Sequence, residues 1–372
     1  MNHRITAIAL AGMACLVHSA IAAPPGSGTP QILPTVLGTS SNCAQSLGTG
    51  INGGTGQPPL QVTAQGGACS DSQPKPLLWT QSTGMLDLGT IGGAGGGSAE
   101  AVSDDGTAVG WLAGGVGLAF VRTLGGPMEE LPKLPGMTYA SAQNVSPNGR
   151  FIVGSSSSDT AFVAVRWDRS SGSWQPTRIP SGGAVAVSDT GAVAGSIAVA
   201  GGTTERKARV WTDNGSVELP GIDTRANDIS ADGTVVVGYR LQDVDCRRPP
   251  CGKYEVPMVW TLQSDEWIAQ ELTALDGVAS EAIAVAEVNA RTVIVGYGYT
   301  KKDAIMRAVY WKADAQGTYG PPTRLGGLDG NPGAIASARD INSSGQVAGY
   351  SGILSRSPRK PSNIVAVIWQ LP

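Results

Sequence analysis

The sequence contains little histidine, phenylalanine or charge. Of its 372 residues, 2 are His and 3 are Phe, and 15% are charged, whereas 52 are Gly and 24 are Pro. So much glycine and proline disfavours long helices and favours many short strands joined by turns. With 41% hydrophobic residues, the chain still has enough apolar surface for a sizeable core. We therefore expect an all-β protein and exclude a helix bundle.

Residues 1–22 have the pattern of a secretory signal peptide. Arg4 precedes an apolar run from Ile5 to Val17, and small residues follow up to the expected cleavage site near Ala22. The run is too short to span a membrane, and no later stretch reaches 18 apolar residues. Lipid attachment at Cys15 is disfavoured because the residues before it match a lipobox poorly. The sequence thus predicts a periplasmic or extracellular protein, with residues 23–30 as a flexible segment.

Removal of the signal peptide takes both histidines, His3 and His18, from the chain. A chain without histidine cannot form Ser-His-Asp or Cys-His nucleophilic sites, histidine bases or histidine metal sites. Arg4 leaves as well, so 25 Lys and Arg stand against 29 Asp and Glu, and nucleic acid is not the expected partner. We expect no catalytic, cofactor-binding or metal-binding residues, and no cofactor.

Four cysteines remain, and an even number in an exported chain favours disulfides. They allow three connectivities, of which proximity in sequence suggests Cys43 with Cys69 and Cys246 with Cys251. Their spacing does not match a zinc ribbon or knuckle, and oxidation competes with metal binding outside the cytosol.

One phrase recurs along the chain: an Ala, two variable residues, Val or Ile, Ser or Asn, a turn with Gly, and an apolar run that ends in Gly. Five clear copies begin at Ala99, Ala142, Ala184, Ala226 and Ala338. A sixth, from Ala284, lacks the turn glycine. The terminal glycines lie 41 to 58 residues apart, at Gly110, Gly154, Gly195, Gly238, Gly296 and Gly349.

Two further pieces recur between these copies. One is an apolar strand closed by Trp, at Trp79, Trp167, Trp211, Trp260, Trp311 and Trp369; the other is a Leu/Pro/Gly phrase. Each unit thus offers four short strands, and one such sheet cannot bury both faces unless neighbouring sheets stack on it, as in a propeller. The recurring Trp side chains should lie in the core, whereas Trp174 and Trp267, outside the pattern, should be exposed.

These pieces predict a β-propeller of about seven four-stranded blades, with six or eight as alternatives, in one repeat domain over residues 31–372. The full units cover approximately residues 75–117, 118–160, 161–204, 205–253, 254–303 and 304–362. A composite blade of residues 31–74 and 363–372 closes the ring, because the C-terminal strand pairs with the N-terminal blade and no long edge remains unpaired.

The segments "DLGTIGG" from Asp87 and "DINSSGQVAGYS" from Asp340 resemble bacterial extracellular repeats of the HAF type. The resemblance covers most of residues 75–372, although most Trp-ending strands lack the family's aromatic dipeptide and the copy at Ala284 is eroded. It implies an exported, β-propeller-like protein without an established catalytic centre.

Acidic residues offer weak candidates for a site. The turns "SDDG", "SDTG" and "SADG", from Ser103, Ser188 and Ser230, lack the residue that separates Asp from Gly in the Asp-box of sialidase propellers, so we interpret them as turns. A glycosidase needs only two carboxyl groups, one of them with a raised pKa. Candidate acids exist, but no pattern pairs them: Glu129, Glu130, Asp276, Glu281 and Glu287.

The long connections after Gly238, Gly296 and Gly349 should emerge on one face, because they join equivalent points of successive units. They carry ten cations that form a candidate ligand face: Arg240, Arg247, Arg248, Lys253, Lys301, Lys302, Arg307, Arg356, Arg359 and Lys360. Solvated loops are the simple interpretation, and binding of an anionic envelope polymer or an acidic protein is the functional one.

The sequence as a whole predicts a monomeric, non-catalytic binding or interaction module, whose partner is a protein or polysaccharide of the cell envelope or exterior. The alternative is a carboxylate-dependent, glycoside-acting enzyme on the same scaffold.

Overall fold

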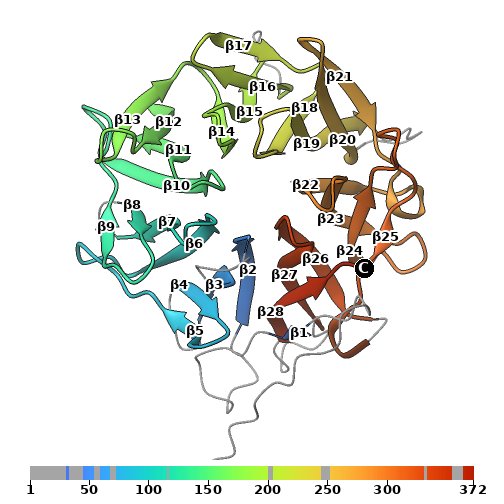
Figure 1. Cartoon of the computed structure of the whole chain (residues 1–372), viewed down its shortest axis with the longest axis horizontal. Coiled ribbons are helices and arrows are strands. Elements are labelled where there is room, and N and C mark those ends of the chain that lie inside the picture. Colours follow the sequence, from blue (N-terminus) through green and yellow to red (C-terminus); the bar gives the residue numbers. More distant parts are fainter. Residues whose placement is uncertain are drawn as a thin grey trace, which may run out of the picture.

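The structure is a computed structural model, and it describes residues 31–32, 45–53, 59–67, 73–114, 117–199, 204–243, 252–330, 333–353 and 363–372. Within these residues the chain forms seven antiparallel sheets of four strands, arranged as a ring of blades around a central axis (Figure 1). This confirms the predicted all-β propeller of seven blades. In the described part of the chain, no helix is long and apolar enough to cross a membrane.

Each blade is named here by its strands from the axis outward. Blades 1 to 3 are β2 (Gln45–Ile51), β3 (Gln61–Gly67), β4 (Lys75–Thr80) and β5 (Gly84–Asp87); β6 (Gly96–Val102), β7 (Ala108–Ala113), β8 (Leu118–Arg122) and β9 (Met128–Glu130); and β10 (Tyr139–Val145), β11 (Phe151–Ser157), β12 (Phe162–Asp168) and β13 (Gln175–Ile179). Blades 4 and 5 are β14 (Gly183–Val187), β15 (Val193–Ala198), β16 (Arg206–Thr212) and β17 (Gly215–Glu218); and β18 (Thr224–Ile229), β19 (Val235–Asp243), β20 (Lys253–Gln263) and β21 (Glu266–Glu271). Blade 6 is β22 (Ser280–Glu287), β23 (Thr292–Tyr299), β24 (Met306–Lys312) and β25 (Thr323–Arg324), and blade 7 is β26 (Ile335–Ile341), β27 (Gln346–Ile353), β28 (Asn363–Gln370) and β1 (Gln31–Ile32).

The sheets group the strands differently from the sequence units. Each sheet begins at the axis with the Ala-x-x-Val strand, and the Trp-ending strand, which opens the sequence units, is the third strand of its blade. Strands β2 to β5 therefore form a complete blade, and the composite blade joins β1 to β26, β27 and β28. The repeat shows how long each unit is, but it does not show which of the four strands comes first in a blade. The blade boundaries could therefore not be predicted from the pattern alone.

The motif glycine is required by a bulge in the innermost strand. In blade 3, Ala142 pairs with Gly154, and the register shifts between Ala142 and Asn144 because Gln143 is an extra residue in the strand. A Cβ atom on Gly154 would overlap the backbone carbonyl oxygen of Ser141. The same pairing and overlap recur at Gly110, Gly195, Gly238, Gly296 and Gly349. In blade 6 the residue opposite the glycine is Ala282, so the sixth copy of the phrase starts at Ala282 and not at Ala284.

The turns between the first and second strands form as predicted. The Ser or Asn before each turn accepts a backbone N–H bond at 2.9 to 3.1 Å, and the turn glycine has a φ between +72° and +82°, in the turns that contain Gly106, Gly149, Gly191, Gly233 and Gly345. In the eroded copy, Asn289 and Ala290 take φ values of +51° and +55° in their place. Ala290 thus adopts a left-handed conformation that favours glycine.

The recurring Trp residues of blades 3 to 7 bond each of these blades to the one before it. Trp167, Trp260, Trp311 and Trp369 are fully buried, which confirms their predicted place in the core. The indole Nε1 of Trp260 donates to the carbonyl oxygen of Pro220, in the Leu/Pro/Gly phrase that ends the preceding blade, at 2.8 Å. Equivalent bonds to the preceding phrase are made by Trp167, Trp211, Trp311 and Trp369.

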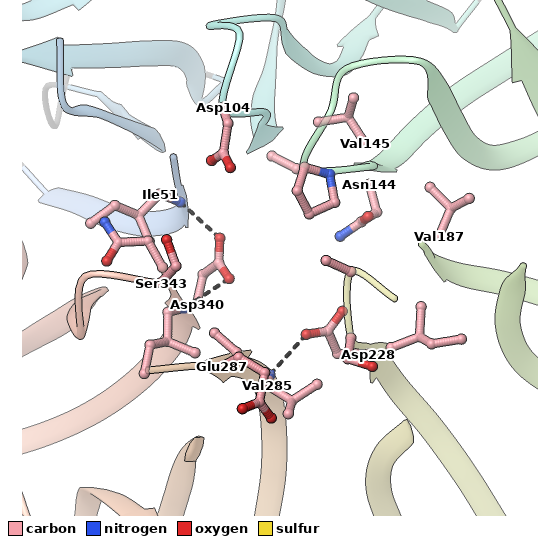
Figure 2. A pocket seen from close by; sticks show the side chains of 18 of the residues that line it. Ile51, Asp104, Asn144, Val145, Val187, Asp228, Val285, Glu287, Asp340 and Ser343 are labelled. Carbon is pink, nitrogen blue, oxygen red and sulfur yellow. Dashed lines mark hydrogen bonds between the residues drawn. The ribbon is translucent and has the colours of Figure 1, made fainter. Parts of the chain in front are cut away.

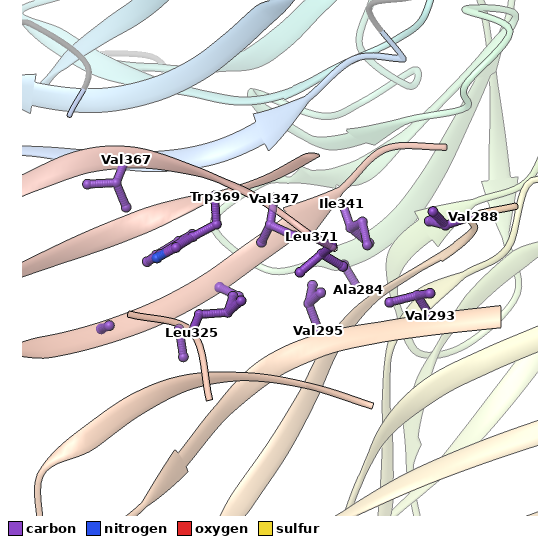
Figure 3. Close-up of a cluster of buried hydrophobic side chains, with 13 residues drawn as sticks. Ala284, Val288, Val293, Val295, Leu325, Ile341, Val347, Val367, Trp369 and Leu371 are labelled. Carbon is purple, nitrogen blue, oxygen red and sulfur yellow. The ribbon is translucent and has the colours of Figure 1, made fainter. Parts of the chain in front are cut away.

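Two tryptophans differ from the prediction. Trp174 and Trp267 are partly buried, because they pack against the hydrophobic clusters between blades. The clusters themselves join facing sheets. Figure 3 shows one of them, where Val293 and Val295 of blade 6 face Val347 and Trp369 of blade 7.

The ring closes in blade 7. The N-terminal β1 pairs with the C-terminal β28 through Gln31 opposite Ile368 and Ile32 opposite Val367, as the predicted closure requires. Nearer the axis, the bonds that join blade 7 to blade 1 include Asn342 Nδ2 to the Asn52 carbonyl oxygen at 2.7 Å, Ile51 N–H to Asp340 Oδ2 at 2.8 Å, and Ala366 N–H to Ser46 Oγ at 3.0 Å.

Candidate functional site

The innermost strands line a central channel in repeating levels. One level is a collar of seven aliphatic side chains, contributed by the motif Val or Ile of every blade: Ile51, Val102, Val145, Val187, Ile229, Val285 and Ile341. The collar surrounds a cavity of about 250 Å³ on the side of the turns between first and second strands, which we call the hairpin face (residues 51–53, 59–61, 102–108, 145–151, 187–193, 229–235, 287–292 and 341–346; Figure 2).

Two aspartates occupy the next level of the channel. At the position before the collar, most blades have Gly, Ala or Asn, but blades 5 and 7 have Asp228 and Asp340. Asp228 Oδ2 accepts the N–H of Val285 of blade 6 at 2.9 Å, and Asp340 Oδ2 accepts that of Ile51 of blade 1. Each carboxyl group is therefore hydrogen-bonded to the innermost strand of the following blade, as the dashed lines in Figure 2 show.

Burial raises the pKa of both aspartates. It brings the pKa of Asp228 to about 8, with the Asp340 charge adding to the shift and the N–H groups of Val285 and Ile229 opposing it. The pKa of Asp340 rises to about 7 by burial, against the opposing N–H bonds of Ile51 and Ile341. The two carboxyl groups are thus electrostatically coupled across the channel.

These shifts predict that stability falls as the pH rises from about 4 to about 8. Over that range the folded state keeps protons on Asp228 and Asp340 that the unfolded chain, with aspartate pKa values near 3.9, has released. The pKa shift of Asp223 has the opposite effect on the pH dependence of stability. Burial opposes its ionisation, but bonds from Lys253, Arg225 and the Arg206 N–H outweigh it and lower the pKa to about 2. Its stabilising contribution is therefore lost as the pH falls from about 4 to about 2.

Urea unfolding at pH values from 2.5 to 9 measures both effects. The free energy of unfolding should be highest between about pH 4 and 5. Asp228→Asn should reduce its decrease above pH 5, and Asp223→Asn should reduce its decrease below pH 4. Asp159→Asn, at an exposed loop position, is the control. A stability that rises between pH 5 and 8 in the unmodified protein would contradict the shifts at Asp228 and Asp340.

The hairpin-face half of the channel is acidic. Asp104, Asp232 and Glu287 line it together with Asp228 and Asp340, and its described lining includes no Lys or Arg. Asp104 Oδ1 accepts the N–H of Gly53 at 2.5 Å. Burial raises the pKa of Asp104, and this N–H bond opposes the shift. This half of the channel therefore favours a cationic group and disfavours an anion.

The opposite half opens on the face where the second strand of each blade ends and the third begins. We call this the long-loop face; it consists of the C-terminal halves of the second strands and of the described residues that follow them up to the third strands. Its cavity measures about 220 Å³, and its polar lining includes Thr49, Glu100, Gln143, Asn227, Glu281 and Arg339. Glu281, one of the acids singled out in the sequence, accepts the hydroxyl of Tyr297 at 2.5 Å and the amide of Asn227 at 2.8 Å. Burial raises the pKa of Glu281, although these two bonds oppose the shift.

Tyrosines beside this mouth were missed by the sequence reasoning. Tyr239, Tyr297, Tyr299 and Tyr350 are half-buried on the second strands of blades 5, 6 and 7. Three of them directly follow the motif glycine, and so does Trp111 in blade 2, whose Nε1 donates to Glu100 at 2.7 Å. The recurrence of an aromatic residue after this glycine is the signal that could have identified them.

Three of the other four candidate acids, Glu129, Glu130 and Asp276, lie away from the channel. Glu130 pairs with Lys133, and Asp276 pairs with Arg324 at 2.9 Å, both on the outer part of their blades. Glu129 lies on the outermost strand β9, whereas Glu287 lines the acidic half and accepts the hydroxyl of Thr292 at 2.6 Å. Among the described residues, no group of three His, Cys, Asp or Glu is arranged to hold a metal ion.

Half of the predicted cationic ligand face can be placed. Arg240 pairs with Glu271 at 2.6 Å, Lys253 with Asp223 at 2.8 Å and Arg307 with Asp303 at 3.4 Å. Lys301 and Lys302 are exposed on the long-loop face, and neither forms an ion pair within the described residues. The remaining cations and all the cysteines lie outside the described residues, as do residues 1–30: Arg247, Arg248, Arg356, Arg359, Lys360, Cys43, Cys69, Cys246 and Cys251.

Comparison with known proteins agrees with the architecture. No family model and no curated protein matches the chain. Among solved structures, the β-propeller domain of the Trilobed protease from Pyrococcus furiosus aligns with a TM-score of 0.53 at 9% identity, over 89% of this chain and 94% of that one. The chain has a β-propeller fold. An oligogalacturonate lyase in complex with manganese aligns with a TM-score of 0.52 at 11% identity, over 92% of this chain and 97% of the lyase. A prolyl endopeptidase aligns with a TM-score of 0.51 at 14% identity, over 87% of this chain and 46% of its own.

Proposed function

We propose that this propeller is an exported, non-catalytic binding module that contacts its partner through the long-loop face. The observation that carries the proposal is the set of four half-buried tyrosines on the second strands of blades 5 to 7. One of them, Tyr297, bonds to Glu281 in the lining of the open channel mouth. Aromatic side chains are enriched where proteins bind partners, because they supply large contact area at low entropic cost. The propeller fold itself does not select a function, since its structural neighbours include a lyase and peptidases.

The two faces differ in what they offer a partner. On the hairpin face, neighbouring turns are bonded to one another: Asp104 N–H to the Pro147 carbonyl at 2.7 Å, Asn148 N–H to Asp189 Oδ1 at 2.8 Å, and Asp189 N–H to the Ala231 carbonyl at 2.8 Å. The polar groups of these turns are therefore used in hydrogen bonds between neighbouring blades. The long-loop face instead combines tyrosines with exposed charged residues and connections of unequal length, a combination typical of binding surfaces.

The partner we propose is a protein or polysaccharide of the cell envelope or exterior. Export rests on the signal peptide predicted for residues 1–22. An anionic polymer is supported by Lys301 and Lys302, which are exposed on this face without an ion pair among the described residues. The other three described cations of the ligand face already face a carboxylate, so they offer less to an anion.

A glycoside-acting enzyme is the second candidate, and Asp228 and Asp340 favour it. They are coupled carboxyl groups with raised pKa values in a channel. Two features disfavour hydrolysis: both groups are held by backbone N–H bonds, and the two cavities of about 250 and 220 Å³ are smaller than the roughly 300–1,000 Å³ of common ligand sites. If hydrolysis occurs, Asp228→Asn should abolish release of reducing sugar from envelope polysaccharide.

The binding proposal is tested with the chain without its first 22 residues, on a glycan array and as bait for envelope extracts. Tyr350→Ala, on the long-loop face, should weaken retention of the partner about tenfold or more. Ala231→Arg, at an exposed position on the hairpin face, should leave it unchanged. Equal retention by both variants would contradict the assignment of the face. The anionic-polymer hypothesis has its own test, in which Arg247, Arg248, Lys301 and Lys302 are all replaced by Ser. If this variant still retains an anionic glycan, that hypothesis is wrong.

A further inference from the structure

Every blade contributes one bulge residue to the long-loop end of the channel. The register between the first and second strands shifts in all seven sheets, so each innermost strand has one extra residue with no residue opposite it. All seven of these bulge residues line the cavity of about 220 Å³: Thr49, Glu100, Gln143, Val185, Asn227, Ile283 and Arg339. The mouth of the channel is therefore a ring to which each blade contributes one position.

The bulge residues divide this ring into a polar part and a more apolar part. Blades 7, 1, 2 and 3 follow one another around the axis, and we call their bulge residues the polar arc: Arg339, Thr49, Glu100 and Gln143. Blades 4 to 6 contribute Val185, Asn227 and Ile283. A ligand in the mouth thus meets hydrogen-bonding groups from four consecutive blades, and aliphatic groups from two of the other three.

Three of the bulge side chains are held in place by the protein itself. Thr49 Oγ1 donates to the carbonyl oxygen of Ala99 at 2.6 Å, and Asn227 Nδ2 donates to that of Ala282, the equivalent residue of its own following blade, at 2.8 Å. Glu100 Oε1 accepts the indole N–H of Trp111 at 2.7 Å. These bonds fix the side chains before a ligand arrives, which lowers the entropic cost of binding. Within the described residues they leave Glu100 Oε2 and Asn227 Oδ1 without a hydrogen bond.

The other two polar side chains of the ring have no partner among the described residues. Arg339 and Gln143 are exposed, and neither side chain makes a hydrogen bond or an ion pair there. A guanidinium group only donates hydrogen bonds, an ionised carboxylate only accepts them, and an amide does both. The polar arc therefore offers donors and acceptors that a ligand could use within one cavity.

We propose that the polar arc binds an uncharged sugar, the terminal residue of a polysaccharide chain. A sugar hydroxyl both donates and accepts hydrogen bonds, so it can pair with the guanidinium group of Arg339, the carboxylate of Glu100 or the amide of Gln143. An anion attracted by Arg339 would be repelled by Glu100 and Glu281, and a cation attracted by these carboxylates would be repelled by Arg339. An uncharged ligand rich in hydroxyl groups avoids both penalties. The proposal rests on the proposed function, since it names the class of ligand that the long-loop face recognises.

The dimensions of the mouth favour a terminal sugar over an internal one. The cavity measures about 220 Å³, and Asp228 and Asp340 line both it and the cavity of the hairpin face, so they lie between the two. A single ring can enter such a space end-on, whereas a residue with neighbours on both sides cannot. Opposite the polar arc, Val185 and Ile283 offer aliphatic surface to the C–H groups of the sugar ring.

Saturation-transfer NMR titration of the chain without its first 22 residues tests the assignment. The uncharged probes are the methyl glycosides of glucose, galactose, mannose and N-acetylglucosamine, and the charged probes are those of glucuronic acid and glucosamine. At least one uncharged probe should bind more tightly than both charged ones. Arg339→Ala should weaken its binding at least tenfold and Gln143→Ala at least threefold. Arg178→Ala, at an exposed position on the outermost strand β13, is the matched control and should change the affinity less than twofold.

Three outcomes would overturn the site. They are no binding of any uncharged probe, tighter binding of a charged probe, and an unchanged affinity in Arg339→Ala. Preference for the glucuronide would assign a carboxylate to Arg339 in place of a hydroxyl. If no glycoside binds while Tyr350→Ala still releases the partner from envelope extracts, the sugar site is wrong and the binding face stands. If the partner is retained equally by Tyr350→Ala and Ala231→Arg, the proposed face fails as well.

Discussion

Replacement of Gly154 by alanine should prevent the protein from folding or lower its stability by about 3 kcal/mol or more. The added Cβ would overlap the carbonyl oxygen of Ser141, which is backbone and cannot turn aside as a side chain can. The carbonyl lies there because the bulge at Gln143 pushes the innermost strand toward its partner. Relief of the overlap would require separating β11 from β10, the strand that lines the channel in blade 3.

Gly183→Ala is the matched control for this change. Gly183 also lies in a strand, its φ is not in the left-handed region, and a Cβ there would meet no atom within 4 Å. Its replacement should change stability by less than about 1 kcal/mol. Urea unfolding followed by circular dichroism measures both variants. Gly154→Ala with a midpoint equal to that of the unmodified protein would contradict the steric explanation of the motif.

Replacement of Trp260 by alanine should destabilise the protein by about 3 to 5 kcal/mol. The side chain is fully buried in the cluster that joins blades 4 and 5, so its removal leaves a large cavity. Trp260→Phe separates the two contributions of the residue. It retains most of the apolar contact but leaves the Pro220 carbonyl without its indole donor, which should cost about 1 to 3 kcal/mol.

Trp267→Phe controls for a general effect of losing an indole. Trp267 packs against the same cluster, is only partly buried, and makes no Nε1 hydrogen bond within the described residues. Chemical denaturation should therefore place Trp267→Phe close to the unmodified protein and Trp260→Phe well below it. Equal losses in the two phenylalanine variants would show that the bond between Trp260 and the preceding blade contributes little.

The repeat in the sequence predicts the blade architecture because each recurring residue has a local task. The Ser and Gly of the turns, the apolar strand and the buried Trp recur at regular intervals in the sequence, and each has the same role in the blades that carry it. The partner of each Trp could not be predicted in this way. The bond from Trp260 to Pro220 crosses between blades, and a repeat unit read alone contains no information about which edge meets its neighbour.

The candidate sites were predicted less well because they arise where the repeats differ. Asp228 and Asp340 replace Gly, Ala or Asn at one position of the innermost strand, and only closure of the ring brings two blades that are not adjacent to face each other. The cationic residues were visible in the sequence, but the structure shows Arg240 and Arg307 already facing carboxylates. Tyr239, Tyr297 and Tyr350 directly follow the motif glycine, so these three tyrosines could have been found from the repeat.

The pairing of β1 with β28 has a consequence for the order of the chain. The first and last described strands are neighbours in one sheet, and blade 7 is bonded to blade 1 much as any blade is to the next. A circularly permuted protein, with its two ends joined by a linker and new termini cut between Ile179 and Gly183, would therefore keep every strand beside its present neighbours. The pairing of β1 with β28 in blade 7 thus makes the order of the strands around the ring independent of where the chain is opened.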